Sequence, residues 1–184
     1  MGHPGSVNTG CHAGLPIGRS GADTRDMIPD HIGTLREAAV AEAGVVAEML
    51  DAFNREYDTP TPGPAVLTGR LRRLLADGTV IAVLAGQPAV AVALLTLRPN
   101  VWYEGQVALL DELYVVPALR GQGIGSAVLD RAEAIARQRG AEMLEINVDG
   151  QDADARRFYE RHGYTNTEPG QDEPMLYYYR RLGP

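Results

Sequence analysis

Three glycines at alternate positions mark the stretch of this sequence that is best suited to chemistry. Gly121, Gly123 and Gly125 follow an apolar, strand-like run and open a long helical pattern. Glycine has no Cβ, so its backbone N–H group can come close to a ligand. The first N–H groups of a helix also lack partners within the helix and lie at its positive end. The combination predicts an anion site, and a pyrophosphate group is its natural occupant.

The spacing of these glycines excludes the two most familiar nucleotide-binding motifs. The dinucleotide motif G-x-G-x-x-G needs its third glycine one residue later than Gly125. The P-loop needs a lysine after its last glycine, and this chain contains arginine but no lysine. The turn therefore predicts a phosphate-bearing ligand of another kind.

Hydrophobic periodicity and the positions of glycine and proline predict the elements around this turn. We expect strands at 32–38, 79–85, 89–97, 107–116, 142–148 and 174–182, and helices at 39–57, 66–78, 123–139 and 152–163. Residues 79–97 are apolar enough to suggest a membrane span, but Gly86, Gln87 and Pro88 interrupt them, so two strands and a tight turn fit better. The order predicts one α/β domain over residues 30–184, with a mixed sheet and helices on both faces.

Composition narrows the class of protein further. The single cysteine, Cys11, excludes an internal disulfide framework and suits a reducing, cytoplasmic location. The net charge of −7 argues against nucleic acid or an anionic membrane as a partner, and it favours a cationic substrate. Many acidic proteins, however, carry such a charge for solubility alone. Residues 1–29 lack an apolar period and are expected to be a disordered leader, in which we predict no metal site.

At residues 115–129 the sequence VVPALRGQGIGSAVL resembles the acetyl-CoA-binding motif of the GNAT family of N-acetyltransferases. The resemblance covers roughly residues 30–182. It implies a mostly antiparallel mixed sheet of about six or seven strands, with acetyl-CoA as acetyl donor and no metal. It also implies that the turn backbone holds the pyrophosphate, while the preceding strand lines the pantetheine arm. The cofactor-binding residues would then be Leu113, Tyr114, Val115, Arg120, Gly121, Gln122, Gly123, Ile124, Gly125 and Ser126.

A later stretch, residues 152–164, resembles a second motif of the same family, N-x-x-A-x-x-x-Y-x-x-x-G-F. The resemblance implies that Tyr159 is the acid that protonates the departing thiolate, a role that a phenol with a pKa near 10 can fill. The alternative is that its ring serves only packing. Asp152 stands where the family usually has asparagine, so it is either a cofactor contact or only the cap of the helix.

The attacking amine must lose a proton, and acidic side chains near the glycine turn are candidates for that base. Asp111 and Glu112 precede the turn, and Glu145 on the following strand is a third candidate. Neighbours on a strand point to opposite faces, so at most one of the adjacent pair is expected to face the reacting centre. Each of these acids could instead be a solvated or ion-paired group.

The sequence LDELYVVP at residues 110–117 is similar to the corresponding sequence in the diamine-acetylating branch of the family. The resemblance implies a small cationic amine as acceptor, held by residues of the first two helices and neighbouring loops, namely Phe53, Tyr57, Asp58 and Trp102. Two alternatives stay open: acetylation of a protein N-terminus or lysine, and a non-catalytic acyl-CoA-binding module. The aromatic run at 176–179 permits a homodimer.

Overall fold

The computed structural model describes residues 33–102 and 104–183, so the leader expected at 1–29 lies outside the described residues. The elements follow in the order β1 (Leu35–Glu37), a short 3-10 helix (Val40–Glu42), α1 (Ala43–Glu56), α2 (Pro64–Ala76), β2 (Val80–Ala85), β3 (Ala91–Pro99), β4 (Gln106–Val115), a second 3-10 helix (Pro117–Leu119), α3 (Ile124–Gln138), β5 (Ala141–Ile146) and α4 (Ala153–Arg161). This matches the expected order up to α4.

Local sequence explains where several helices begin. Pro64 occupies the first turn of α2, where a missing N–H group costs nothing, so this helix starts two residues before the predicted residue 66. The side chain of Asp152 accepts a hydrogen bond from the N–H of Ala155 and so caps α4. The prolines before Pro64 keep residues 57–63 as a loop between α1 and α2.

The five strands form one sheet in the order β1-β2-β3-β4-β5. The first four pair antiparallel, whereas β4 and β5 pair parallel. The mixed, mostly antiparallel α/β class is confirmed, but the described residues contain five strands rather than the predicted six or seven. The parallel pair matters for function, because α3 must cross between β4 and β5 and so places the glycine turn at the end of β4.

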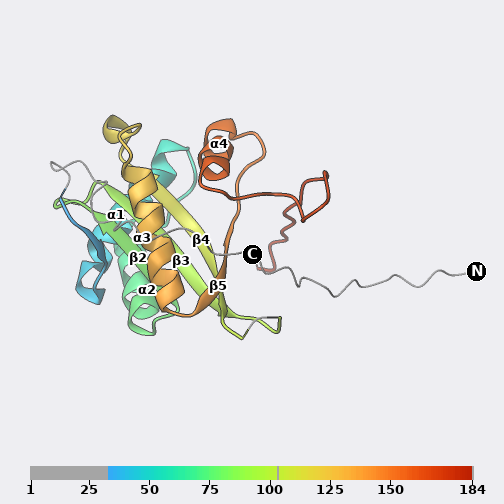
Figure 1. Cartoon of the computed structure of the whole chain (residues 1–184). Helices are drawn as coiled ribbons and strands as arrows, with labels where there is room; N and C mark the ends of the chain where they lie inside the picture. The colour runs from blue at the N-terminus through green and yellow to red at the C-terminus, as the bar shows by residue number, and fades with distance from the viewer. Residues whose placement is uncertain (1–32, 103, 184) are drawn as a thin grey trace, which may run out of the picture.

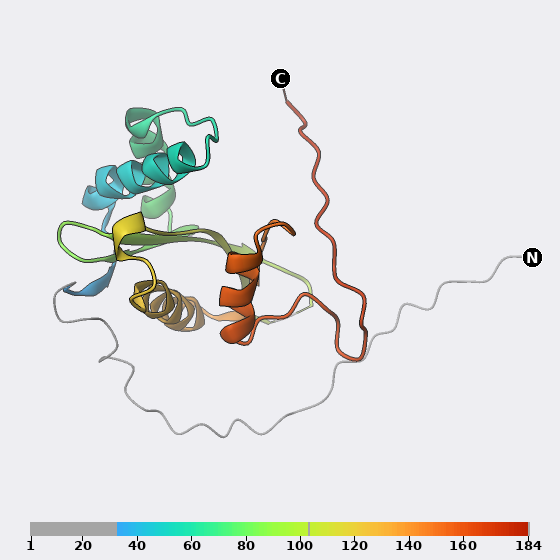
Figure 2. The same ribbon diagram turned by 90° about the horizontal axis from the view of Figure 1, so that it is seen from above.

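Helices cover both faces of the sheet, as Figures 1 and 2 show. α1 and α2 pack on one face around Val46, Leu50 and Leu84, whereas α3 packs on the other around Val128 and Leu129. All six residues of β2 are buried, because this strand is covered from both sides. The apolar run of residues 80–85 is therefore a strand in the core. Within the described ranges, every helix is too short or too polar to cross a bilayer.

The C-terminal segment differs from the prediction. The strand expected at 174–182 is absent, and the only pairing described beyond α4 is an isolated bridge between Thr167 and Pro174. In Figure 2 the segment runs away from the domain, and its apolar residues are exposed, Leu176 by 69% and Tyr178 by 83%. A strand needs a neighbour for its backbone hydrogen bonds, and the described chain does not bring one to this segment.

Candidate active site

The glycine turn has the backbone geometry that an anion site needs. Gly121 and Gly123 have φ values of 75° and 82°, in the left-handed region that favours glycine. The first helical hydrogen bond of α3 runs from the N–H of Ala127 to the carbonyl of Gly123, at 3.1 Å. The N–H groups of residues 124–126 precede this bond and so have no acceptor within the helix. A Cβ placed at Gly121 or Gly123 would meet nothing within 4 Å, so the turn's backbone faces open space.

A pocket of about 380 Å³ lies over this turn. Most of the predicted cofactor-binding residues line it, namely Leu113, Val115, Arg120, Gly121, Gly123, Ile124, Gly125 and Ser126. Gln122 and Tyr114 do not line it; the side chain of Tyr114 is 5% exposed and turns towards α1 and α2. Only the backbone of Tyr114 is therefore available to a ligand beside β4.

The pocket also has three lining residues that the sequence analysis did not assign to it, Leu119, Phe158 and Arg161. The Phe158 ring lies 3.6 Å from the position of a Cβ on Gly125. Phe158 and Arg161 are three residues apart on α4, so they share one face of that helix. This spacing is the signal that could have placed the Arg161 cation beside the phosphate site.

In the second half of β4, the backbone edge that faces β5 is not paired with it. The parallel pairing of the two strands ends where Leu110 meets Ile146, although β4 continues to Val115. The edge of residues 111–115 is thus available for hydrogen bonds with an extended ligand, in the way that an added strand pairs with a sheet. This edge leads directly to the glycine turn.

A β-bulge places both acids of the pair on the same face of the sheet. Leu110 and Leu113 both pack in the core beneath α3, although regular alternation would put them on opposite faces. The register between β3 and β4 shifts at this point, and Asp111 is the extra residue. Asp111 and Glu112 therefore both lie on the face of α1 and α2, and the expected opposite orientation was wrong.

The two carboxyl groups differ in their surroundings. Burial, and then the charge of Asp111, raise the pKa of Glu112 to about 6. Glu112 makes no side-chain hydrogen bond with any described residue. Burial also raises the pKa of Asp111, while a hydrogen bond donated by the Thr96 hydroxyl lowers it. Glu112 is thus a carboxylate near neutral pH with free lone pairs, as a general base requires.

Tyr159 is carried by α4 and packs against the core on the α3 side of the sheet. Burial raises the pKa of its phenol to about 12, and the charges of Asp152 and Glu112 add to the rise. The phenol therefore stays protonated, and its hydroxyl has no hydrogen-bond partner among the described residues. Glu112 lies on the other face of the sheet, but its charge still contributes to this rise, so the two groups are within electrostatic reach of each other.

Arg120 fixes the start of the glycine turn to the end of α1. Its guanidinium donates to both carboxylate oxygens of Glu56, at 2.6 and 2.8 Å, and its Nε donates to the carbonyl of Val115 at 2.9 Å. The same group lies 5.6 Å from the centre of the Tyr114 ring. The charge of Arg120 is thus directed towards α1, a contact that sequence spacing could not reveal.

Two of the predicted acceptor residues come together at the C-terminal end of α1. The ring of Phe53 lies 5.3 Å from that of Tyr57 and 5.2 Å from that of Tyr114, measured between centroids. Asp58 follows the helix with a φ of 50° and is exposed. These residues lie near the end of β4 that leads into the glycine turn.

The loop that follows α1 is held by Asp51, which is 5% exposed. Its carboxylate accepts a hydrogen bond from the Thr61 hydroxyl at 2.8 Å and pairs with Arg55 at 2.8 Å. The loop at 57–63 is therefore tied to α1 by a buried charge-assisted bond. Sequence analysis missed Asp51 because its partner side chain lies in a loop.

Two other predicted residues lie apart from this group. Trp102 is 80% exposed in the turn between β3 and β4, at the opposite end of β4 from the glycine turn. Glu145, the third candidate base, is ion-paired with Arg98. Asp152 lies at the start of α4, where its cap bond with the N–H of Ala155 measures 2.9 Å.

Several known proteins similar to this chain are named as acetyltransferases. The crystal structure of a protein from Arthrobacter sp. FB24 that is assigned as an acetyltransferase shares 55% identity, with a TM-score of 0.78, over 82% of this chain and 97% of that one. Aminoalkylphosphonate N-acetyltransferase of Salmonella typhimurium is 36% identical over 93 residues, which are 50% of this chain and 54% of the relative. Aminoglycoside N(6')-acetyltransferase type 1 of Klebsiella aerogenes is 42% identical over 76 residues, 40% of this chain and 49% of the relative. The chain thus spans about half the length of these two curated relatives.

The Acetyltransferase (GNAT) family profile matches residues 46–164, which include β4, the glycine turn, α3 and α4. The chain therefore belongs to the GNAT family of acetyltransferases, and the resemblance stated from its motifs is confirmed. Membership implies acetyl-CoA as the acetyl donor.

Proposed function

We propose that this protein transfers the acetyl group of acetyl-CoA directly to a primary amine of a small, cationic molecule. The observation that carries the proposal is the free edge of β4, which runs from the carboxylate of Glu112 to the open backbone of the glycine turn. Tyr159, on α4, lies within electrostatic reach of Glu112. A donor site, a base and an acid are thus arranged along one path.

The residues present fit acetyl-CoA. Unpaired N–H groups at the start of α3 suit its diphosphate, and the exposed guanidinium of Arg161 adds a positive charge to the same pocket. Leu113 and Val115 offer apolar contacts and a free backbone edge to its extended pantetheine arm. When bound, acetyl-CoA supplies a thioester whose carbonyl carbon is open to attack by an amine.

Glu112 and Tyr159 are assigned opposite proton transfers. Glu112 accepts a proton from the ammonium form of the acceptor, directly or through one water, and so generates the nucleophilic amine. As the C–N bond forms and the C–S bond breaks, Tyr159 donates its phenolic proton to the departing sulfur, and the attacking nitrogen loses its second proton to solvent. The products are an N-acetyl amide and the free thiol of coenzyme A. Solvent then returns a proton to Tyr159 and removes one from Glu112.

Charge around the acids supports a cationic acceptor. Asp111 and Glu112 lie side by side on the α1 and α2 face, and the chain as a whole carries a net charge of −7. Both curated relatives reported above are named for acceptors that are small amines. We place the acceptor on this face, near Phe53, Tyr57 and Asp58.

The proposal is tested by measuring thiol release from acetyl-CoA with a panel of aminoalkylphosphonates, aminoglycosides, polyamines, basic amino acids and peptides. We expect release that depends on a small amine, above the rate of acetyl-CoA hydrolysis in its absence. Turnover with peptides alone would instead support a protein acetyltransferase. Acetyl-CoA binding without turnover of any amine would support a non-catalytic module.

We also propose that two copies of the chain can pair through their C-terminal segments. The described outer edge of β5 pairs with no strand, and the exposed run at 176–179 contains three tyrosines. Burying these side chains in a dimer interface would favour association by roughly 1.5–3 kcal/mol of free energy for each large apolar side chain that becomes fully buried. Light scattering on the intact chain and on a chain ending at residue 173 would test this, since only the intact chain is expected to dimerise.

A further inference from the structure

The helix that carries Tyr159 is held to the domain by the packing of Phe158 and Tyr159 against the core and not by polar contacts. None of the residues of α4 is fully buried. The side-chain hydrogen bonds of residues 152–163 remain within this segment or reach the loop just before it; they join Asp152 to Ala155, Arg156 to Gly150, Arg157 to Asp154 and His162 to Phe158. In the described part of the chain, none of them fixes α4 to the sheet or to another helix.

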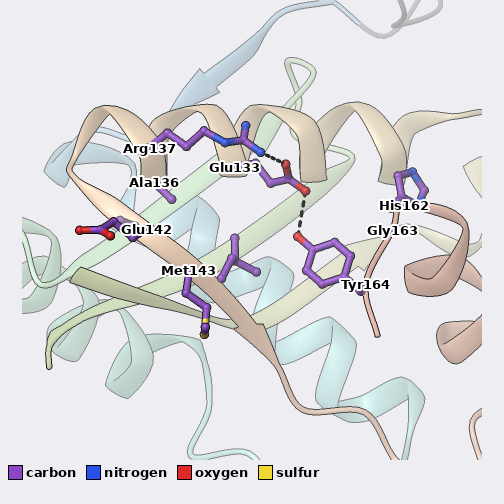
Figure 3. Close-up of a pocket in the computed structure, with 10 residues that line it drawn as sticks. Glu133, Ala136, Arg137, Glu142, Met143, His162, Gly163 and Tyr164 are labelled. Atoms are coloured by element: carbon purple, nitrogen blue, oxygen red, sulfur yellow. Dashed lines mark hydrogen bonds and ion pairs between the residues drawn. The ribbon is translucent and has the colours of Figure 1, made fainter. Parts of the chain in front are cut away.

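The next residue, Tyr164, makes the polar link that α4 itself lacks. Its hydroxyl donates a hydrogen bond to Oε1 of Glu133 on α3, at 2.9 Å. Arg137, one turn further along α3, donates to Oε2 of the same carboxylate. Figure 3 shows the two bonds meeting at Glu133. The acceptor is therefore held from both sides by donors, which makes it a fixed anchor.

Packing beside this link is incomplete. A pocket of about 280 Å³ lies between α3, β5 and the turn after α4, with Glu133, Met143, Leu144 and Tyr164 among its walls. In Figure 3 the bond from Tyr164 to Glu133 bridges the side of this pocket. Because the space is not filled by side chains, the hydrogen bond adds a fixed contact on this side to the packing of Phe158, Tyr159 and Tyr164 against the core.

Tyr164 is also in direct contact with the proposed acid. Gly163 ends α4 with a φ of 87°, which turns the chain back so that the N–H of Tyr164 donates to the carbonyl of Tyr159 at 3.1 Å. The two rings meet edge to face, with centroids 5.8 Å apart. Burial, and then the bond to Glu133, raise the pKa of Tyr164 well above its usual range, so it stays a donor at neutral pH.

We propose that Tyr164 and Glu133 are positioning residues, whose hydrogen bond sets the place of the Tyr159 phenol relative to the donor site. The proposal rests on the proposed function. α3 begins at the glycine turn, and α4 carries the proposed acid. The bond between Glu133 on α3 and Tyr164 therefore connects the cofactor-binding turn to the helix of the acid. It assigns to Tyr164 a role that acts through Tyr159, with no contact to the substrates.

The test is a set of kinetic measurements on Tyr164→Phe, which keeps the ring and removes the hydroxyl. We expect kcat to fall by about tenfold, since small displacements of a catalytic group cost up to about a hundredfold. The KM for acetyl-CoA should stay unchanged, because the glycine turn is untouched. Glu133→Gln keeps an acceptor oxygen and should retain most activity, whereas Glu133→Ala should behave like Tyr164→Phe. Glu160→Gln, which changes an exposed carboxyl on α4, is the control and should leave kcat unchanged.

A double variant separates positioning from a general loss of structure. If Tyr164 acts through Tyr159, adding Tyr164→Phe to Tyr159→Phe should lower kcat no further. A further tenfold loss in the double variant, or full activity in Tyr164→Phe alone, would overturn the inference. Should Tyr164→Phe fail to fold, the Glu133→Gln and Glu133→Ala pair gives the same comparison. Full activity in Tyr159→Phe would instead overturn the acid assigned under the proposed function.

Discussion

Replacing Glu112 with glutamine is expected to stabilise the folded protein at pH 8 while it removes the proposed base. Burial, and then the charge of Asp111, raise the pKa of Glu112 from its usual 4.5 to about 6. At about 1.36 kcal/mol for each pH unit, this difference corresponds to at most roughly 2 kcal/mol of free energy of unfolding. Solvent screening of a half-buried group reduces the expected effect to about 1 kcal/mol.

The sign follows from the two pKa values. Since the pKa of Glu112 is higher in the folded protein than in the unfolded chain, its protonated form favours folding. This contribution is complete below about pH 4.5 and is lost as the pH rises through about 6. Glutamine has no proton to lose in this pH window. The variant therefore keeps at pH 8 the contribution to the free energy of unfolding that the wild-type chain loses.

Urea unfolding of both proteins at pH 4 and pH 8 measures the effect. The stability of Glu112→Gln relative to wild type should be about 1 kcal/mol greater at pH 8 than at pH 4. Glu104→Gln, at an exposed carboxyl in the turn between β3 and β4, should show no such dependence. If the difference between Glu112→Gln and wild type were the same at both pH values, the raised pKa and the base assigned from it would be refuted.

Three further predictions concern the same site. Tyr159→Phe should lower kcat by at least about a hundredfold, as loss of a general acid does, while calorimetry finds the same affinity for acetyl-CoA; equal losses in both would point to packing. Gly123→Leu should weaken acetyl-CoA binding in calorimetry because its side chain would enter the phosphate site, and it should cost about 1–2 kcal/mol of stability from the left-handed backbone; unaltered affinity would contradict the site. Asp111→Asn should move the acid limb of the kcat/KM profile from about pH 6 to a lower pH, because it removes the neighbouring charge that raises the pKa of Glu112; an unmoved limb would show that another group titrates there.

Local features of this protein could be predicted from its sequence. The glycine turn and α3 are encoded within one stretch, because φ preference and helical periodicity act over a few residues. The buried hairpin of β2 and β3 was likewise predicted from two apolar runs on either side of Gly86, Gln87 and Pro88. The order of elements up to α4 followed from the same kind of signal.

Features that depend on pairing between distant segments could not be predicted. The bulge at Asp111 exists only in the register of β4 against β3, so alternation along β4 alone gave the wrong orientation of the acid pair. The bond between Tyr164 and Glu133 spans 31 residues. The C-terminal run at 174–182 has the composition of a strand, but composition does not supply the neighbour that a strand needs.

The most direct test of the central claim is a crystal structure of the protein with coenzyme A. The account predicts diphosphate oxygens within hydrogen-bond distance of the N–H groups of residues 121–126, and the pantetheine arm along residues 111–115 of β4. Coenzyme A bound elsewhere, such as in the pocket beside Tyr164, with the glycine turn left free, would contradict it.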